Sequence, residues 1–130
     1  MSEDINQEDT VSDLTSTIDT YFAAWNETGA ARRAELIEQV WAPEGRLIDP
    51  PLTGEGHQGI SDMIATAHGQ FPGCKFRRVS AVDTHHDQLR VAWELVTPDG
   101  TVAVSGLDTG EIDEQGKLVR IVGFFGPIPD

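Results

Sequence analysis

Residues 89–125, LRVAWELVTPDGTVAVSGLDTGEIDEQGKLVRIVGFF, contain three runs in which apolar and polar side chains alternate, separated by two polar turns. Alternation with a period of two is typical of β-strands that bury one face. The runs are Leu89–Val96, Val102–Ile112 and Leu118–Phe125, and a fourth run, Phe76–Val82, precedes them. Because the connections are short, we expect successive strands to form antiparallel hairpins.

The first part of the chain follows a helical period instead. Thr10 and Asp13 resemble a capping box that opens a helix, and Asn26-Glu27-Thr28-Gly29 ends it. Apolar and aromatic side chains recur in this helix at spacings of three and four residues, which predicts a buried stripe. The stripe consists of Leu14, Ile18, Tyr21, Phe22 and Trp25.

Two further helices and one strand are expected before the long strand region. The second helix runs from about Ala30 to Trp41, because Pro43 prevents its continuation. A short strand at Arg46–Asp49 and a glycine-rich loop at Thr53–Gly56 lead to the third helix, whose apolar stripe ends at Phe71. Three helices followed by a strand meander predict an α+β domain with the helices on one face of a curved sheet.

The chain organisation is that of one domain. Residues 1–9 are acidic and nearly free of large apolar side chains, so we expect them to form a flexible tail. Residues 10–130 are enough for a single domain and leave no room for a second one of ordinary size.

The charge of the chain excludes several classes of partner. There are 9 Lys and Arg residues against 22 Asp and Glu residues, a net charge of −13. Binding to phosphate backbones or to an anionic membrane surface requires clustered basic residues, so we expect neither a nucleic-acid nor a membrane partner. Residues 1–4 are unlike a signal peptide, and Cys74 has no second cysteine to pair with. We therefore expect a cytoplasmic protein.

Three polar residues stand where apolar ones are expected. Tyr21 lies on the stripe of the first helix, Asp49 ends a strand on the same face as Leu47, and Asp108 interrupts the inward face of its strand. Two carboxyl groups and a phenol in one cavity are able to move a proton and to stabilise an enolate oxygen. The alternative is that Asp49 is a turn residue and that Asp108 caps a turn or pairs with an arginine.

The order of these motifs resembles the nuclear transport factor 2-like superfamily, especially its SnoaL-like polyketide cyclases and ketosteroid isomerases. The motifs are YFAAWN at 21–26, WAP at 41–43, DP at 49–50, a glycine-containing loop with its helix, and GKLVRI at 116–121. The resemblance covers residues 10–126. It implies a cone-shaped α+β fold in which a curved, mostly antiparallel sheet and three N-terminal helices enclose a pocket.

The resemblance also implies roles for single residues. Asp49, followed by a proline at the end of a strand, matches the general base of the ketosteroid isomerases. Asp108 stands nine residues before Lys117 and matches their second, protonated aspartate. Tyr21 matches their first-helix tyrosine, and Phe125 falls where an aromatic side chain lines the pocket.

The implied activity is that of an isomerase or cyclase acting on a small hydrophobic or aromatic molecule. Proton transfer next to a carbonyl requires no cofactor and no metal, so neither is expected. The resemblance also implies a homodimer through the outer face of the sheet, and the valine and leucine side chains on both faces of the strands are consistent with one face being covered by a partner. The aromatic and histidine side chains expected to line the pocket are Trp25, Trp41, His68, Trp93 and Phe125.

Two other functions stay open. A non-catalytic binding module for a hydrophobic metabolite predicts that Asp108 meets the ligand while Asp49 faces solvent or pairs with Arg46. A structural dimer domain predicts a collapsed cone filled by the three tryptophans. A metal site at His85-His86-Asp87 is not expected, since adjacent residues of a strand point in opposite directions and a turn rarely supplies a third ligand.

Overall fold

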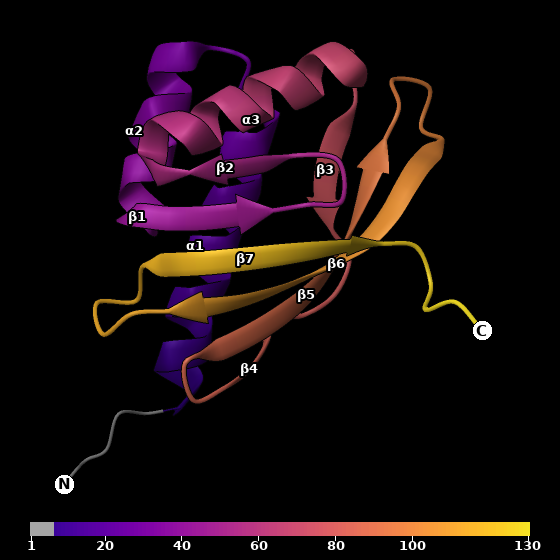
Figure 1. The fold of residues 1–130 in the computed structure, drawn as a ribbon. Helices are drawn as coiled ribbons and strands as arrows, with labels where there is room; N and C mark the ends of the chain where they lie inside the picture. Colours follow the sequence, from indigo (N-terminus) through magenta and orange to yellow (C-terminus); the bar gives the residue numbers. More distant parts are fainter. Residues whose placement is uncertain (1–6) are drawn as a thin grey trace, which may run out of the picture.

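The computed structural model describes residues 7–130, with the backbone alone for residues 7–12. These residues form three helices and seven strands (Figure 1). In chain order the elements are α1 (Gln7–Asn26), α2 (Ala30–Val40), β1 (Trp41–Ile48), β2 (Thr53–Glu55), α3 (Gly56–Gln70), β3 (Lys75–Arg78), β4 (Asp83–His85), β5 (Gln88–Val96), β6 (Val102–Ile112) and β7 (Leu118–Phe125).

The strands form one curved sheet in the order β2-β1-β7-β6-β5-β3, and β4 also pairs with β5. The strand pairs are antiparallel, except that β1 runs parallel to β7. Figure 1 shows α1 passing behind the strands, with α2 and α3 gathered beside β1 and β2. The predicted α+β class and the cone-like arrangement of three helices on a mostly antiparallel sheet are confirmed.

The helices are held by a core that lies between them and the sheet. The predicted stripe of α1 is buried along its whole length, from Leu14 to Trp25. Full burial of one large apolar side chain contributes about 1.5–3 kcal/mol, so packing outweighs helix propensity here. Seven fully buried aliphatic side chains from the other elements lie in the same core, namely Ile37, Leu47, Ile60, Ile64, Val91, Leu118 and Ile121.

Two boundaries near the start of the chain differ from the sequence prediction. Helix α1 begins at Gln7, so residues 7–9 of the predicted tail are helical, while residues 1–6 of it lie outside the described residues. Strand β1 begins at Trp41, directly after α2 and earlier than the predicted start at Arg46. Pro43 is tolerated there because the pairing with β7 is irregular between Trp41 and Arg46, where no regular ladder hydrogen bond is required.

Two other segments were assigned wrongly from the sequence. The predicted strand at 76–82 ends early, because β3 stops at Arg78, and a second strand, β4, begins only at Asp83; the two pair with opposite halves of β5. The break is made by Ser80, whose hydroxyl accepts a hydrogen bond from the backbone N–H of Ala92 in place of a carbonyl. The predicted loop at 53–56 contains the short strand β2, which is too short to show an alternating pattern.

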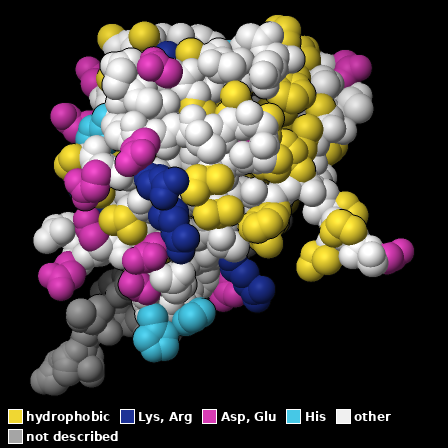
Figure 2. All heavy atoms as spheres, viewed as in Figure 1, with side chains coloured by type: hydrophobic (Ala, Val, Ile, Leu, Met, Phe, Trp, Pro, Cys, Tyr) yellow, Lys and Arg dark blue, Asp and Glu magenta, His cyan; other side chains and the backbone are white. Residues whose placement is uncertain are grey.

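The surface is acidic, and its apolar side chains are unevenly distributed. Figure 2 shows Asp and Glu side chains scattered over the visible face, while apolar side chains gather on the side where α3 and β7 end. Leu107 and Phe124 are exposed neighbours on the outer face of the sheet. Dimerisation through that face stays a prediction. Among the helices of residues 7–130, none has the length and hydropathy required to cross a lipid bilayer.

Candidate active site

Asp108 lies on the inner face of β6 and is only 3% exposed. The Tyr21 hydroxyl donates a hydrogen bond to its Oδ2 at 2.7 Å, and the Trp93 indole N–H donates to its Oδ1 at 2.9 Å. Burial raises the pKa of Asp108 to about 7 against the opposing effect of the Tyr21 hydroxyl, and the nearby charge of Asp49 raises it further. A carboxyl group in this position is able to carry a proton at neutral pH.

Tyr21 is held at the same place by α1 and is 2% exposed. Burial raises the pKa of Tyr21 well above its ordinary value, and the negative charges of Asp108 and Asp49 act in the same direction. The hydroxyl therefore keeps its hydrogen and acts as a hydrogen-bond donor.

Asp49 follows the last residue of β1, in a tight connection to β2. Its backbone N–H donates to the Leu52 carbonyl at 2.9 Å, which fixes the turn through two prolines. Its half-buried carboxylate makes no hydrogen bond or ion pair with any residue that the structure describes. Burial alone raises the pKa of Asp49 to about 6. It is thus a desolvated, unpaired carboxylate.

Gly123 on β7 brings the two carboxyl groups side by side. It stands opposite Asp108 in the strand register. A side chain added at this glycine would overlap Asp49 Oδ1 and would lie 2.9 Å from Asp108 Oδ1, so both carboxyl groups occupy the space above it. Their mutual repulsion contributes to the raised pKa of Asp108. Glycine is therefore required at position 123 for the pair to form.

A narrow cavity begins at Asp49, the one charged residue in its lining. Its volume is about 30 Å³, which is room for roughly two water molecules. Phe71 and Phe125, which are 37% and 40% exposed, belong to both the lining and the surface. The lining residues are Trp25, Asp49, Pro51, Leu52, Ala67, Gln70, Phe71, Phe76, Trp93, Leu95, Val104 and Phe125.

Four aromatic rings form a continuous wall of this cavity. Trp25 and Phe76 have ring centroids 4.9 Å apart, Phe76 and Trp93 5.3 Å, and Trp93 and Phe125 5.7 Å. The last two pairs are edge-to-face, which is a favoured arrangement of aromatic rings. The wall is apolar and rigid, and it ends at the carboxyl pair through the Trp93 indole N–H.

Gly106 makes room for the Trp93 indole. It is the register partner of Trp93 on β6, and a side chain at this glycine would overlap the six-membered ring of the indole. We predict that Gly106→Ala lowers the free energy of unfolding by about 1–3 kcal/mol, because the indole must leave its place. Urea denaturation measures this loss, and Gly69→Ala, the same change at an exposed position of α3 where the added side chain meets no other atom within 4 Å, is the control and should not lower stability. An unchanged midpoint for Gly106→Ala would contradict the packing described.

The residues predicted from the sequence do not all meet. The structure brings together Tyr21, Asp49 and Asp108, and it places Trp25, Trp93 and Phe125 in the cavity lining. Two predicted lining residues lie elsewhere, and both make structural contacts instead.

Trp41 and His68 are these two residues. Trp41 is buried in the core, where its ring packs against Tyr21 at 6.1 Å and covers Gly45. Because it is the first residue of β1 and not the last of a helix, its side chain is not in the cavity lining. A ring nitrogen of His68 lies 2.6 Å from the Trp25 carbonyl oxygen, so this histidine ties α3 to the end of α1.

Sequence reasoning missed two features of the site. The first is the presence of Phe76 and of the α3 residues Ala67 and Gln70 in the cavity lining. The sequence pattern predicts such residues only as core or surface positions. The second is the part played by Gly106 and Gly123, although a glycine inside a strand is a known sign of close approach by another group. That sign was present in both strands.

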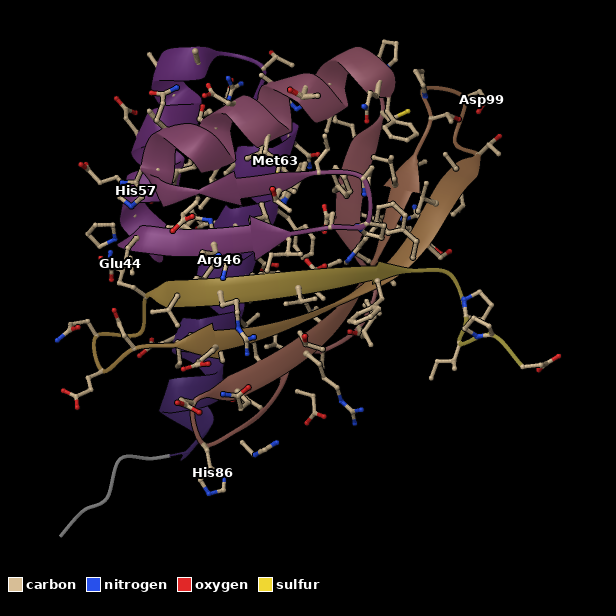
Figure 3. The ribbon with its side chains drawn as sticks, viewed as in Figure 1. Glu44, Arg46, His57, Met63, His86 and Asp99 are labelled. Atoms are coloured by element: carbon tan, nitrogen blue, oxygen red, sulfur yellow. The ribbon has the colours of Figure 1, made fainter. Side chains whose placement is uncertain are left out.

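Among the side chains of residues 13–130, no group of three or more His, Cys, Asp or Glu is arranged to hold a metal ion. His85 and His86 contact each other through their Nδ1 atoms at 3.1 Å. Figure 3 shows His86 at the tip of the turn between β4 and β5, at the end of the molecule away from α3.

Comparisons with known proteins agree with this fold. The family model described as a SnoaL-like domain matches residues 18–121. A proposed isomerase of the SnoaL-like family from Agrobacterium tumefaciens is 38% identical, with a TM-score of 0.82 over 86% of this chain and 96% of that one. No curated protein matches the sequence.

More distant structures share the fold alone. A proposed SnoaL-like polyketide cyclase from Jannaschia sp. CCS1 is 18% identical, with a TM-score of 0.63 over 85% of each chain. An NTF2-like protein of unknown function from Exiguobacterium sp. 255-15 is 17% identical, with a TM-score of 0.66 over 86% of this chain and 99% of that one.

Proposed function

This chain belongs to the SnoaL-like family, and we propose that it is an enzyme that moves a proton at a carbon next to a carbonyl group of a small apolar molecule, as an isomerase or a cyclase. The observation that carries the proposal is Asp49. Its carboxylate is unpaired, lines the cavity and lies beside the carboxyl group of Asp108, which is hydrogen-bonded to the Tyr21 hydroxyl.

Asp49 is the general base in this proposal. A carboxylate removed from water is a stronger base than an exposed one, and the pKa of about 6 lies close to neutral pH, where a base both is ionised and accepts a proton readily. Asp49 takes the proton from the carbon next to the carbonyl. The C–H electron pair forms a C=C bond, and the carbonyl electron pair moves onto the oxygen.

Asp108 and Tyr21 stabilise the negative oxygen that results. A neutral Asp108 and the Tyr21 hydroxyl are hydrogen-bond donors in a site with little water, where such donors have their greatest effect. In an isomerase, Asp49 then returns its proton to another carbon of the same molecule. In a cyclase, the electron-rich carbon attacks a second carbonyl group, and the proton goes to the oxygen of that group.

The small volume of the cavity favours a second candidate, a structural domain in which aromatic rings fill the cone. The cost of the carboxyl pair argues against it. Burying a polar group without a partner costs about 1–3 kcal/mol, and a structural core gains nothing from it. A ligand enters, in our proposal, by displacing Phe71 and Phe125 at the surface end of the cavity.

The pH dependence of turnover tests the proposal. Asp49 must be ionised, so the rate falls as the pH drops below about 6, and Asp108 must be protonated, so the rate falls as the pH rises above about 7. We expect a bell-shaped profile with its maximum between these values, its limbs belonging to the coupled pair.

The substrate for this measurement is 3-cyclohexenone, a small ketone whose double bond moves into conjugation after proton transfer. The product is followed by its ultraviolet absorbance, and deuterium uptake in heavy water reports the proton step itself. Asp108→Asn should lose the alkaline limb. A rate that keeps rising above pH 8, or no exchange with either this ketone or the two-ring 2-tetralone, contradicts the proposal.

A further inference from the structure

The two oxygens of the Asp108 carboxyl group have different partners. The Trp93 indole N–H is a donor and cannot accept, so Oδ1 at 2.9 Å must accept from it. The Tyr21 hydroxyl at 2.7 Å from Oδ2 is able both to donate and to accept. A proton on Oδ2 is therefore the arrangement of neutral Asp108 that keeps both hydrogen bonds.

The direction of the Trp93 N–H is set by packing. Trp93 and Gly106 are opposite each other in the β5–β6 register, and Asp108 lies two residues further along the same face of β6. Because Gly106 has no side chain, the indole lies across β6 and reaches Asp108 diagonally. Phe76 and Phe125 hold the ring from both sides in edge-to-face contact.

We propose that Trp93 is a positioning residue whose indole N–H fixes the Asp108 carboxyl group in one orientation and confines its exchangeable proton to Oδ2, next to Tyr21. Protonated Asp108 then donates to the Tyr21 oxygen, and the Tyr21 hydrogen is free to turn to another acceptor. If the proposed function holds, on which this last consequence rests, that acceptor is the carbonyl oxygen of the substrate.

The ionisable groups that face Asp108 are few. Tyr21 from α1 and Asp49 after β1 are the two that affect its titration. From β5 the facing residues are Val91 and Trp93, and from β7 the facing residue is Gly123; none of the three ionises. A change in the Asp108 titration is therefore traceable to Tyr21, Asp49 or Trp93.

Nuclear magnetic resonance of the protein without substrate tests the proposal. Tyr21 is the single tyrosine of the sequence, so labelling tyrosine with ¹³Cζ gives one signal. We expect that signal, and the indole N–H signal of Trp93, to move with the same midpoint as the ¹³Cγ signal of Asp108. The indole signal of Trp41, which has no contact with Asp108 among the bonds described, should not follow it.

Trp93→Phe removes the N–H and keeps an aromatic ring. In the wild type, the hydrogen bond from Trp93 stabilises the ionised form of Asp108. Without it, the titration midpoint of the Asp108 ¹³Cγ signal should rise by about one pH unit. The change in the Tyr21 ¹³Cζ signal over that titration should become smaller. Trp41→Phe is the matched control, since it also removes an indole from the core, and should leave the midpoint unchanged.

Three results overturn the proposal: a Tyr21 signal that stays flat through the Asp108 titration, an unchanged midpoint in Trp93→Phe, or an equal rise in Trp41→Phe. The wild-type signals decide the matter if Trp93→Phe does not fold. Because no substrate is used, a protein without activity on ketones still gives a clear answer, so failure of the proposed function is separate from failure of this proposal.

Discussion

Replacing Asp49 with asparagine is expected to lower the rate of deuterium uptake by 3-cyclohexenone by about 10³-fold, within the range attributed to general bases. Asparagine has nearly the same shape and cannot accept the proton. Since Asp49 makes no side-chain hydrogen bond within the described part of the chain, the substitution leaves no partner unsatisfied, and the fold should not change.

Ligand binding should survive this substitution. Cyclohexanone binding, followed by the indole signals of Trp25 and Trp93, should give a Kd within about threefold of the wild type, well under 1.4 kcal/mol. Asp62→Asn makes the same chemical change on the exposed side of α3 and is the control for activity. A wild-type rate in Asp49→Asn would rule out this residue as the base, whatever else the cavity does.

Asp108→Asn is expected to make the protein more stable at alkaline pH. Burial raises the pKa of Asp108 to about 7, above the ordinary value of 3.8. A raised pKa means that the full stability is present below 3.8 and is lost as the pH rises toward 7. At pH 8 the variant should therefore unfold with a free energy higher by roughly 3 to 5 kcal/mol, and at pH 3 the two proteins should be nearly equal.

The asparagine side chain preserves the geometry that this comparison needs. Its oxygen accepts from the Trp93 indole, and its amide donates to the Tyr21 oxygen, so both hydrogen bonds are retained. Urea denaturation at several pH values measures the difference. Glu38→Gln, the same kind of change on the exposed face of α2, should give a curve parallel to the wild type. Parallel curves for Asp108→Asn would mean that the buried carboxyl does not titrate as described.

Asp108→Asn should act in opposite directions on stability and on activity. The variant should gain stability at alkaline pH and have a lower maximal turnover, because an amide is a weaker hydrogen-bond donor than a carboxylic acid. Functional sites commonly keep groups that the fold would be more stable without. A gain in stability together with full activity would show that Asp108 is a structural feature alone.

Much of the fold follows from local patterns in the sequence. The stripe of α1 and the alternation of β5, β6 and β7 depend on the side chains of one segment at a time, and the structure agrees with them. The start of β1 and the strand β2 do not follow from local patterns. The start of β1 is set by its pairing with the distant strand β7, and β2 has only three residues, too few to show an alternation. The break at Ser80 similarly depends on one side-chain hydrogen bond across strands.

Part of the candidate site was likewise predictable from local patterns, and part was not. Alternation was enough to turn Asp108 inward, and helical spacing was enough for Tyr21. The indole hydrogen bond of Trp93 was not predictable, because it depends on the diagonal offset between β5 and β6 and on the empty place at Gly106. Trp41 was placed in the lining by residue type alone, while the structure uses its bulk in the core.

The parallel pairing of β1 with β7 also bears on how the molecule folds. The pair joins Trp41 to Leu118, positions 77 residues apart in the chain. Forming a contact between such distant residues first lowers the conformational entropy of the long loop between them, and only then does the contact stabilise the chain. Domains rich in such contacts fold in about milliseconds to seconds. Asp49 follows β1, so it reaches Asp108 only after β7 has joined the sheet. During synthesis, the carboxyl pair is therefore among the last features to assemble, and a folding intermediate without β7 has neither its chemistry nor the cost of its burial.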